Sequence, residues 1–263
     1  MPVGRLHAQV AAIALRAAAR HGFALGGGNA LMAYGVVNRF TADVDLFTDE
    51  ESSVAAAAES VEKALRGAGF GAERRDSASQ DGATGLGDIF YGLGDGLAEW
   101  IVTAPGGEQM MLQMAYFDRS RRPVVMEIGP VLDLEDVVGG KACALASRVE
   151  PRDYIDIAAA LERYTVEQIT GFARRLDPGL TDRDFAEAAE RLDQWGDGVF
   201  ASFGLGPDEI AGLRKRFAAW PRPLYAGPYV HSMPVVLSGV ASTVRWQVAR
   251  HRCDEVGDGK YRF

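Results

Sequence analysis

The stretch Leu25-Gly26-Gly27-Gly28-Asn29-Ala30-Leu31, followed by Arg39-Phe40-Thr41-Ala42-Asp43-Val44-Asp45-Leu46-Phe47, decides the architecture of this chain. The second segment alternates polar and apolar residues, which predicts a strand over 41–47. Residues two apart share one face of a strand, so Asp43 and Asp45 project side by side, roughly 6 to 7 Å apart at Cα. This spacing suits two carboxylates that bind one divalent metal ion, while Val44 and Leu46 point the other way.

The glycines before this strand predict a turn that binds phosphate. Glycine has no Cβ, so the backbone at Gly27 and Gly28 can adopt positive φ and approach phosphate oxygens closely. The N–H groups at the start of the following short helix, expected over 30–34, favour anions. A metal site beside a phosphate cradle indicates nucleotide chemistry.

Composition limits the class of protein. The chain has 263 residues, of which 48% are hydrophobic and 24% charged, as expected for one large globular domain or two small ones. The net charge of −8 and pI near 5.1 argue against a protein that coats nucleic acid by bulk attraction. Three basic clusters remain, and we interpret them as solvated faces, with RNA contact as the alternative: Arg119-Arg121-Arg122, Arg174-Arg175 and Arg214-Lys215-Arg216.

The cysteines and the apolar runs predict a cytoplasmic location. Cys143 and Cys253 have no second cysteine or histidine at zinc-ligand spacing, which favours a reduced compartment. The N-terminal apolar run over 8–15 is interrupted by Arg16 and Arg20, so an amphipathic helix is expected instead of a signal peptide. No segment reaches eighteen apolar residues, which predicts no membrane span.

The pattern along the chain predicts an α/β fold of the α+β type, with a mixed sheet followed by a helical lobe. Helices are expected over 5–21 and 54–67, and strands over 89–91, 98–103, 110–117 and 124–128. Past Leu132 the apolar period changes to about 3.6, with helix starts near Asp133, Pro151, Thr181 and Pro207. We therefore divide the chain into residues 1–132, a helical lobe over 133–221 that completes the site, and a tail over 222–263 without a chemical signal.

The helical part holds a second group of charged residues. Lys141 and Arg148 are seven residues apart and therefore lie on one helical face. Asp153 and Asp156, which follow Arg152, also share a face. Taken alone, the two aspartates are best interpreted as a structural salt-bridge network with Arg148 and Arg152. However, a lysine in an apolar helix is costly to bury without anionic partners, and a triphosphate would supply them.

Other motifs do not fit this sequence. Gly139-Gly140-Lys141 is followed by Ala142, so the hydroxyl that a P-loop offers to Mg²⁺ is missing. The glycines at 26–28 lack the final glycine of a dinucleotide fingerprint. The four histidines lie in flanking segments and suggest no Ser/His/Asp arrangement.

Taken together, these motifs resemble the AbiEii/AbiGii (MenT-like) toxin family within the polymerase-β-like nucleotidyltransferase superfamily. The motifs that carry the resemblance are Gly27-Gly28 with Ala30-Leu31, Arg39 with Thr41-Ala42-Asp43-Val44-Asp45, Lys141 with Arg148, and Arg152-Asp153 with Asp156. The resemblance covers roughly residues 23–161, and helical similarity extends to about residue 220. It implies a polymerase-β-like nucleotidyltransferase domain followed by a helical lobe.

The resemblance also implies a reaction and its participants. Members of this family bind an NTP and Mg²⁺, or Mn²⁺, and add nucleotides to the 3′ end of tRNA or otherwise block translation. An antitoxin protein encoded alongside usually neutralises them. Asp43 and Asp45 would hold the metal, and Asp156, with Asp153 nearby, would position or deprotonate the acceptor hydroxyl. The NTP would contact Gly27, Gly28, Asn29, Arg39, Thr41, Lys141, Arg148 and Asp153, with Lys141 neutralising triphosphate charge.

The chain departs from the family pattern at two places. Asn29 stands where Ser or Thr is commoner. The superfamily often supplies a third acid on a neighbouring strand, but the matching strand here reads Met111-Leu112-Gln113-Met114-Ala115-Tyr116, without a carboxylate. Asp118 and Glu127 are substitutes at the strand margins. A one-metal transferase that relies on Asp156 is consistent with this strand.

Two alternatives to a tRNA-modifying toxin stay open from the sequence. The first is a nucleotidyltransferase that acts on a small molecule of the aminoglycoside type, which an acidic acceptor pocket would favour. The second is a catalytically silent protein that binds the nucleotide without releasing pyrophosphate.

Overall fold

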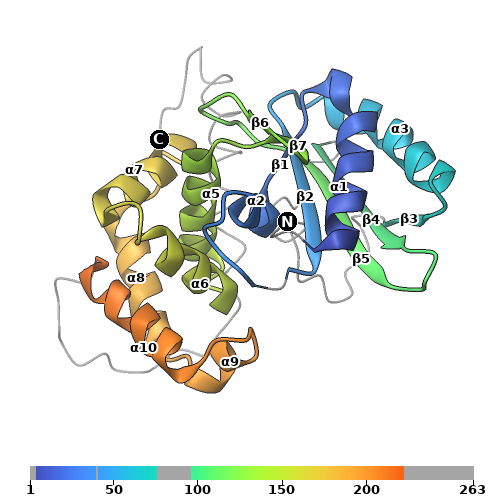
Figure 1. Cartoon of the computed structure of the whole chain (residues 1–263). Coiled ribbons are helices and arrows are strands. Elements are labelled where there is room, and N and C mark those ends of the chain that lie inside the picture. Colours follow the sequence, from blue (N-terminus) through green and yellow to red (C-terminus); the bar gives the residue numbers. More distant parts are fainter. Residues whose placement is uncertain (1–3, 40, 76–95, 222–263) are drawn as a thin grey trace, which may run out of the picture.

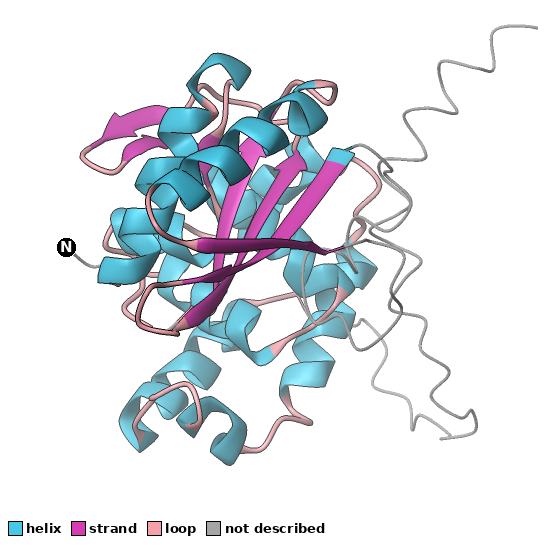
Figure 2. Cartoon of the chain, turned by 90° about the vertical axis from the view of Figure 1, so that its right-hand side faces the viewer, coloured by secondary structure: helices cyan, strands magenta, loops and turns pink. Residues whose placement is uncertain are grey.

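The computed structural model describes residues 4–39, 41–75 and 96–221, and these form a mixed seven-stranded sheet with helices on both faces (Figures 1 and 2). The strand order is β3-β4-β5-β2-β1-β7-β6. The pairs β2/β5 and β1/β7 are parallel, and the other pairs are antiparallel. The strands are β1 Ala24–Leu25, β2 Asp43–Thr48, β3 Gly71–Arg75, β4 Leu97–Thr103, β5 Gln109–Tyr116, β6 Val124–Met126 and β7 Gly129–Val131.

Strand β2 has the alternation that the sequence predicts. Val44 and Leu46 are fully buried, whereas Asp43 and Asp45 are partly exposed on the opposite face. On the side of Val44 and Leu46, the sheet is covered by α1 (Arg5–Ala17) and α3 (Ser53–Gly67), which lie next to each other in Figure 1. The face that carries the two aspartates is therefore the one that turns toward the remaining helices.

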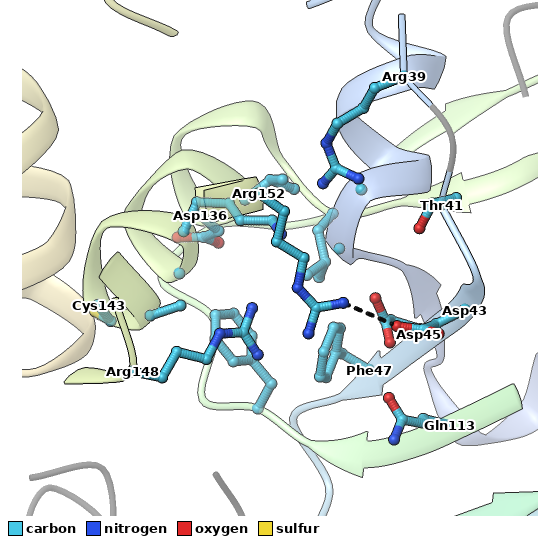
Figure 3. A pocket seen from close by; sticks show the side chains of 18 residues that line it. Arg39, Thr41, Asp43, Asp45, Phe47, Gln113, Asp136, Cys143, Arg148 and Arg152 are labelled. Carbon is cyan, nitrogen blue, oxygen red and sulfur yellow. Dashed lines mark hydrogen bonds and ion pairs between the residues drawn. The ribbon is translucent and has the colours of Figure 1, made fainter. Parts of the chain in front are cut away.

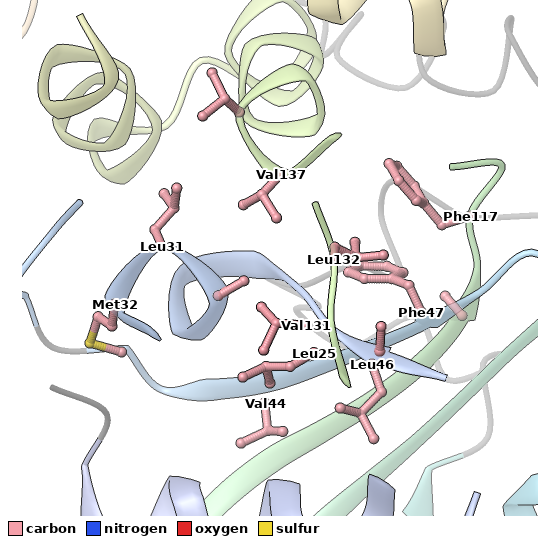
Figure 4. Close-up of a cluster of buried hydrophobic side chains, with 14 of the residues drawn as sticks. Leu25, Leu31, Met32, Val44, Leu46, Phe47, Phe117, Val131, Leu132 and Val137 are labelled. Atoms are coloured by element: carbon pink, nitrogen blue, oxygen red, sulfur yellow. The ribbon is translucent and has the colours of Figure 1, made fainter. Parts of the chain in front are cut away.

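Helices α2 (Gly27–Ala33) and α5 (Leu134–Ser147) connect the sheet to the helical part of the molecule. Figure 4 shows that apolar side chains from the sheet, α2 and α5 meet in one cluster. On the side of the sheet that faces α5, the labelled buried members are Leu31 and Met32 of α2, Phe47 of β2, Leu132, and Val137 of α5. Burial of this kind is worth roughly 1.5 to 3 kcal/mol for each large apolar side chain, so it fixes α5 relative to the strands.

The helical part continues with α6 (Pro151–Ala160), α7 (Val166–Leu176), α8 (Asp182–Leu192), α9 (Asp197–Ala201) and α10 (Pro207–Arg216). The helix starts agree with the sequence signals. The Asp133 side chain accepts a hydrogen bond from the Glu135 amide, and Thr181 forms a capping box with Asp184. Pro151 and Pro207 each occupy the first turn of a helix, where a missing N–H costs nothing.

Several expected boundaries were wrong because they depend on tertiary pairing. The first helix ends at Ala17, and a 3-10 turn follows over Ala19–His21. The helix expected over 30–34 begins at Gly27, so the glycines form its first turn. The strand expected over 124–128 is a hairpin of β6 and β7, which turns at residues 127 and 128.

Two expectations lie outside the described residues, namely the strand over 89–91 and the tail over 222–263. Within the described ranges, no helix combines the length and the apolar character that are needed to cross a bilayer.

Most arginines of the three basic clusters form ion pairs with acids on neighbouring elements, and the exposed pairs among them contribute little stability. These pairs are Arg119–Asp49, Arg121–Glu135, Arg174–Asp182, Arg175–Glu135, Arg214–Asp197 and Arg216–Glu162.

We predict that Gly139→Ala destabilises the protein, because α5 and α7 pack closely at this glycine. A Cβ at Gly139 would lie 2.9 Å from the backbone of Phe172 and 3.0 Å from Leu176 Cδ1. Overpacking of this kind costs about 1 to 3 kcal/mol, which urea unfolding measures. Gly171→Ala in α7 is the control, since a Cβ there meets nothing within 4 Å. An equal effect of the two substitutions would contradict this packing.

Candidate active site

A pocket, here called the central pocket, lies between the sheet and helices α5 and α6 (Figure 3). One wall comes from the glycines of α2 and from β2, and the facing wall comes from charged side chains of the helical part. The charged and polar residues that line it are Arg39, Thr41, Asp43, Asp45, Gln113, Asp136, Lys141, Arg148 and Arg152. The sequence-predicted groups around Asp43 and around Lys141 are therefore brought together in one place.

The carboxylate pair lies on β2, as the strand period predicts. Asp45 is in register with Gln113 on the parallel strand β5. Burial raises the pKa of Asp45 to about 6, the neighbouring Asp43 raises it as well, and Lys141 and Arg152 oppose the shift. Two carboxylates this close resist full ionisation without a cation, so the pair favours binding of a positive ion.

The glycine turn makes room for Asp45. Gly27 has a φ of +58°, and a Cβ at this position would lie 1.8 Å from Asp45 Oδ2. The Gly26 amide donates a hydrogen bond to the Asp45 carbonyl at 2.8 Å, which ties the turn to β2. A Cβ at Gly28 would lie 3.1 Å from Arg39 Nη2 and 3.3 Å from Thr41 Oγ1. Close approach of Asp45 thus requires glycine at position 27, whereas a side chain at position 28 would press against Arg39 and Thr41.

Two aspartates of α6 hold three cations, of which Lys141 and Arg148 belong to the opposite wall and Arg39 to the segment that precedes β2. Asp156 accepts from Arg39 Nε and Nη2, both at 2.7 Å, and pairs with Lys141 Nζ at 2.8 Å. Asp153 accepts from Arg148 Nε at 2.9 Å and from Arg148 Nη2 at 3.0 Å. Its Oδ1 lies 3.6 Å from Lys141 Nζ. The network therefore joins α6 to α5 and to the segment that precedes β2.

Both aspartates are fully buried and ionised. Burial alone would raise the pKa of Asp153, but Arg148 and Lys141 outweigh it and lower this pKa to about 2. Burial acts in the same direction on Asp156, and there Lys141 and Arg39 hold the pKa below its usual range. Their charges are therefore committed to the three cations.

Arg152 reaches across the pocket from α6 to the sheet. Its Nη1 lies 3.3 Å from Asp43 Oδ2, as the dashed line in Figure 3 shows, and its Nε lies 2.6 Å from Glu150. The sequence predicted that Arg152 pairs with Asp153 or Asp156. In the structure Asp156 pairs with Arg39 and Lys141, Asp153 pairs with Arg148, and Arg152 contacts Asp43. Because this contact joins residues 109 apart, no local pattern could indicate it.

The predicted site residues thus divide into two groups. Gly27, Gly28, Arg39, Thr41, Asp43, Asp45, Lys141 and Arg148 line the pocket. Asn29, Asp153 and Asp156 are buried behind it. Asn29 Nδ2 donates to the Asp43 carbonyl at 2.6 Å, so this residue supports β2. The suggested substitutes for a third acid, Asp118 and Glu127, do not line the pocket.

The central pocket also has an apolar side that the sequence did not predict. Phe47 and Phe117 pack against each other with ring centroids 5.3 Å apart, and Leu132 and Val137 lie beside them. Flat aromatic and aliphatic surfaces next to charged groups suit a ligand with one apolar and one anionic end.

The donor atoms fit a hard divalent cation. Asp43 and Asp45 offer carboxylate oxygens from one sheet face, which is the ligand type that Mg²⁺ and Mn²⁺ prefer. Among the described residues, no group of three or more His, Cys, Asp or Glu side chains forms a metal cage. Two carboxylates match an ion that completes its coordination with water and substrate phosphate oxygens.

A comparison with known protein families identifies the family of this chain. The model of the family described as nucleotidyl transferase AbiEii toxin, Type IV TA system, matches residues 10–197. The chain belongs to this AbiEii family. It is therefore a nucleotidyltransferase of a toxin family, and the matched range includes every residue named in the central pocket. No curated protein matches the chain.

Solved structures share the fold of this AbiEii protein. MenT4, a nucleotidyltransferase toxin from Mycobacterium tuberculosis H37Rv, is 15% identical with a TM-score of 0.56, and the match covers 95% of this chain and 89% of MenT4. A putative nucleotidyltransferase from H. pylori is 16% identical with a TM-score of 0.51, and the match covers 81% of this chain and 94% of that one. At these identities the similarity establishes the architecture alone.

We predict that Gly27→Ala is more damaging than Gly35→Ala. Both glycines have nearly the same positive φ, +58° and +64°, so an alanine is strained at either position. Only at Gly27 would the new Cβ collide with Asp45, since Gly35 has nothing within 4 Å. The expected additional loss in the free energy of unfolding is about 1 to 3 kcal/mol, measured by urea unfolding. Equal losses would show that Asp45 has room to move.

We predict that Asp156→Asn strongly destabilises the protein, because it leaves Arg39 and Lys141 with an uncompensated buried charge. The expected loss is about 3 to 5 kcal/mol in urea unfolding at pH 7. The control is Asp182→Asn, which removes an exposed partner of Arg174 and should cost less than about 1 kcal/mol.

The pH dependence provides a second measurement on the same variant. Because folding lowers the pKa of Asp156, its ionised form stabilises the fold above the unfolded value of about 4, and this stabilisation is lost at lower pH. The acid-induced loss of stability below pH 4 should therefore be smaller in Asp156→Asn than in the wild type. An unchanged acid profile would mean that Asp156 does not carry this charge.

Proposed function

We propose that this protein transfers a nucleotide from an NTP to the 3′ end of tRNA in the cytoplasm, and thereby blocks translation until a cognate antitoxin protein neutralises it. The observation that carries the proposal is the position of the Asp43–Asp45 pair opposite Lys141 and Arg148 within one pocket. A carboxylate pair for Mg²⁺ or Mn²⁺ and a cationic wall for phosphates are the two requirements of this reaction.

The two walls of the pocket correspond to the two regions into which we divide the chain. Residues 1–132 supply the glycine turn and the carboxylate pair, and residues 133–221 supply Lys141 and Arg148. A nucleotide bound between them would contact both regions, so neither region alone would form the site.

Seven predicted site residues that line the pocket would act in binding or in charge stabilisation. Gly27, Gly28 and Thr41 would line the phosphates, and Lys141 and Arg148 would neutralise the triphosphate. Asp43 and Asp45 would hold the divalent ion, which supplies charge stabilisation at the phosphorus and on the departing pyrophosphate. The acceptor hydroxyl oxygen forms a bond to the α-phosphorus and gives up its proton to water, while the bond between that phosphorus and the bridging oxygen of pyrophosphate breaks.

Asp156 is better suited to positioning than to proton transfer. The resemblance implied that it positions or deprotonates the acceptor hydroxyl, but its carboxylate is fully buried and bound to Arg39 and Lys141. A general base must come within hydrogen-bond reach of the proton that it accepts. We therefore propose that Asp156 orients Lys141 and Arg39, and that Asp153 orients Arg148.

Four cations line the pocket and would contact an anionic acceptor, namely Arg39, Lys141, Arg148 and Arg152. The acids Asp43, Asp45 and Asp136 also line it, and the ionised Asp153 and Asp156 lie behind it, so a small-molecule acceptor of the aminoglycoside type stays the alternative. A polynucleotide end carries phosphates that such cations attract.

We predict that Asp43→Asn abolishes nucleotide transfer while leaving the fold intact, because Asp43 is partly exposed and lies outside the main core. The assay incubates the protein with each α-³²P-labelled NTP and total tRNA, and follows labelled tRNA and released pyrophosphate. Glu59→Gln on the exposed side of α3 is the matched control and should retain full activity.

The same assay separates the three candidate functions. Label in tRNA with pyrophosphate release supports the proposal. Label in an added aminoglycoside, but not in tRNA, would replace the acceptor. Binding of NTP with no pyrophosphate from any acceptor would identify a silent nucleotide-binding protein, and activity retained by Asp43→Asn would refute the metal assignment.

A further inference from the structure

Three polar side chains form a row across adjacent strands next to the carboxylate pair. Asp45 on β2 is in register with Gln113 on β5, and Gln113 is in register with Glu99 on β4. Residues in register lie side by side on the same sheet face. Gln113 is 1% exposed and lines the central pocket, and Glu99, which is 8% exposed, lies behind it.

Glu99 is a buried carboxylate with a neutral partner. Gln113 Nε2 donates a hydrogen bond to Glu99 Oε1. The next residue in the row, Arg75 on β3, is in register with Glu99. A carboxylate that accepts a hydrogen bond inside the protein binds its donor strongly, so Glu99 constrains the orientation of the Gln113 amide.

This hydrogen bond determines which end of the Gln113 amide faces the pocket. An amide group has one donor end and one acceptor end. Because the NH₂ group is directed toward Glu99, the oxygen is directed toward Asp43 and Asp45, as Figure 3 shows. Amide oxygens are ordinary ligands of hard divalent cations.

We propose that Gln113 Oε1 is the third protein oxygen at the divalent ion held by Asp43 and Asp45, and that Glu99 is the positioning residue that fixes its orientation. This inference rests on the proposed function, since it concerns the same metal. In this arrangement the neutral Gln113 takes the place of a third carboxylate at the metal ion, and the charge of Glu99 lies behind it.

The arrangement explains why a neutral side chain stands between two acids. A carboxylate at position 113 would lie between Asp45 and Glu99 and would put three like charges in a row. Like charges at such distances disfavour ionisation of one another. The amide avoids this repulsion while it keeps an oxygen in the pocket.

The test is the affinity for Mn²⁺, measured by electron paramagnetic resonance with and without a non-hydrolysable NTP analogue. Gln113→Ala and Glu99→Ala should each weaken Mn²⁺ binding by about tenfold or more, as loss of a ligand or of its orienting partner does. Glu99→Gln keeps a hydrogen-bond acceptor for the amide and should bind Mn²⁺ nearly as well as the wild type. Gln109→Ala, at an exposed glutamine of the same strand, is the matched control.

A double variant keeps the test decisive if the alanine variants fail to fold. Glu99→Gln combined with Gln113→Glu exchanges the two side chains, retains their hydrogen bond and brings the charge next to the metal. It should bind Mn²⁺ at least as tightly as the wild type. Weaker binding by this exchanged pair would overturn the proposal.

Asp43→Asn separates this inference from the proposed function. If Asp43→Asn abolishes Mn²⁺ binding while folded Gln113→Ala leaves it unchanged, the role of Gln113 is wrong and the metal site stands. If Asp43→Asn has no effect on Mn²⁺ binding, the metal assignment itself is wrong, and the inference falls with it.

Discussion

The site depends on two carboxylates that have no contact with solvent. Asp153 and Asp156 on α6 remain ionised inside the protein only because Arg39, Lys141 and Arg148 surround them. The aspartates direct these three cations toward the pocket, where a triphosphate would meet charges that are already in place. Such preorganised charge is the main source of catalysis when the protein's task is to position groups and stabilise charge.

The opposite wall is limited by space as well as by charge. Asp45 occupies the volume that a side chain at Gly27 would need, and the turn is joined to β2 by the hydrogen bond from Gly26. Arg152 lies next to Asp43 and partly balances the pair. The pocket thus combines a carboxylate pair that can bind a cation with a wall of cations that can bind phosphates. A nucleotide with its bound metal ion matches both.

Much of this arrangement was predictable from local sequence patterns. The alternation around Val44 placed Asp43 and Asp45 on one face, the spacing of Lys141 and Arg148 placed both on one helical face, and capping residues marked the helix starts. The short strands β1 and β7 were not predictable, since two or three residues form a strand only when partners align them. The row from Asp45 through Gln113 to Glu99 depends on register between strands, and the burial of Asp156 depends on how α6 meets Arg39. Neither the strand register nor the packing of α6 can be predicted from a short stretch of sequence.

The most direct measurement is a crystal structure of the protein with Mn²⁺ and a non-hydrolysable NTP analogue. The anomalous scattering of manganese locates the ion without reference to any assumed ligand. We expect the ion between Asp43 and Asp45, with the triphosphate against Lys141 and Arg148 and with both α6 aspartates still paired to their cations. A nucleotide bound elsewhere, or bound after Asp156 has released Lys141, would contradict this account.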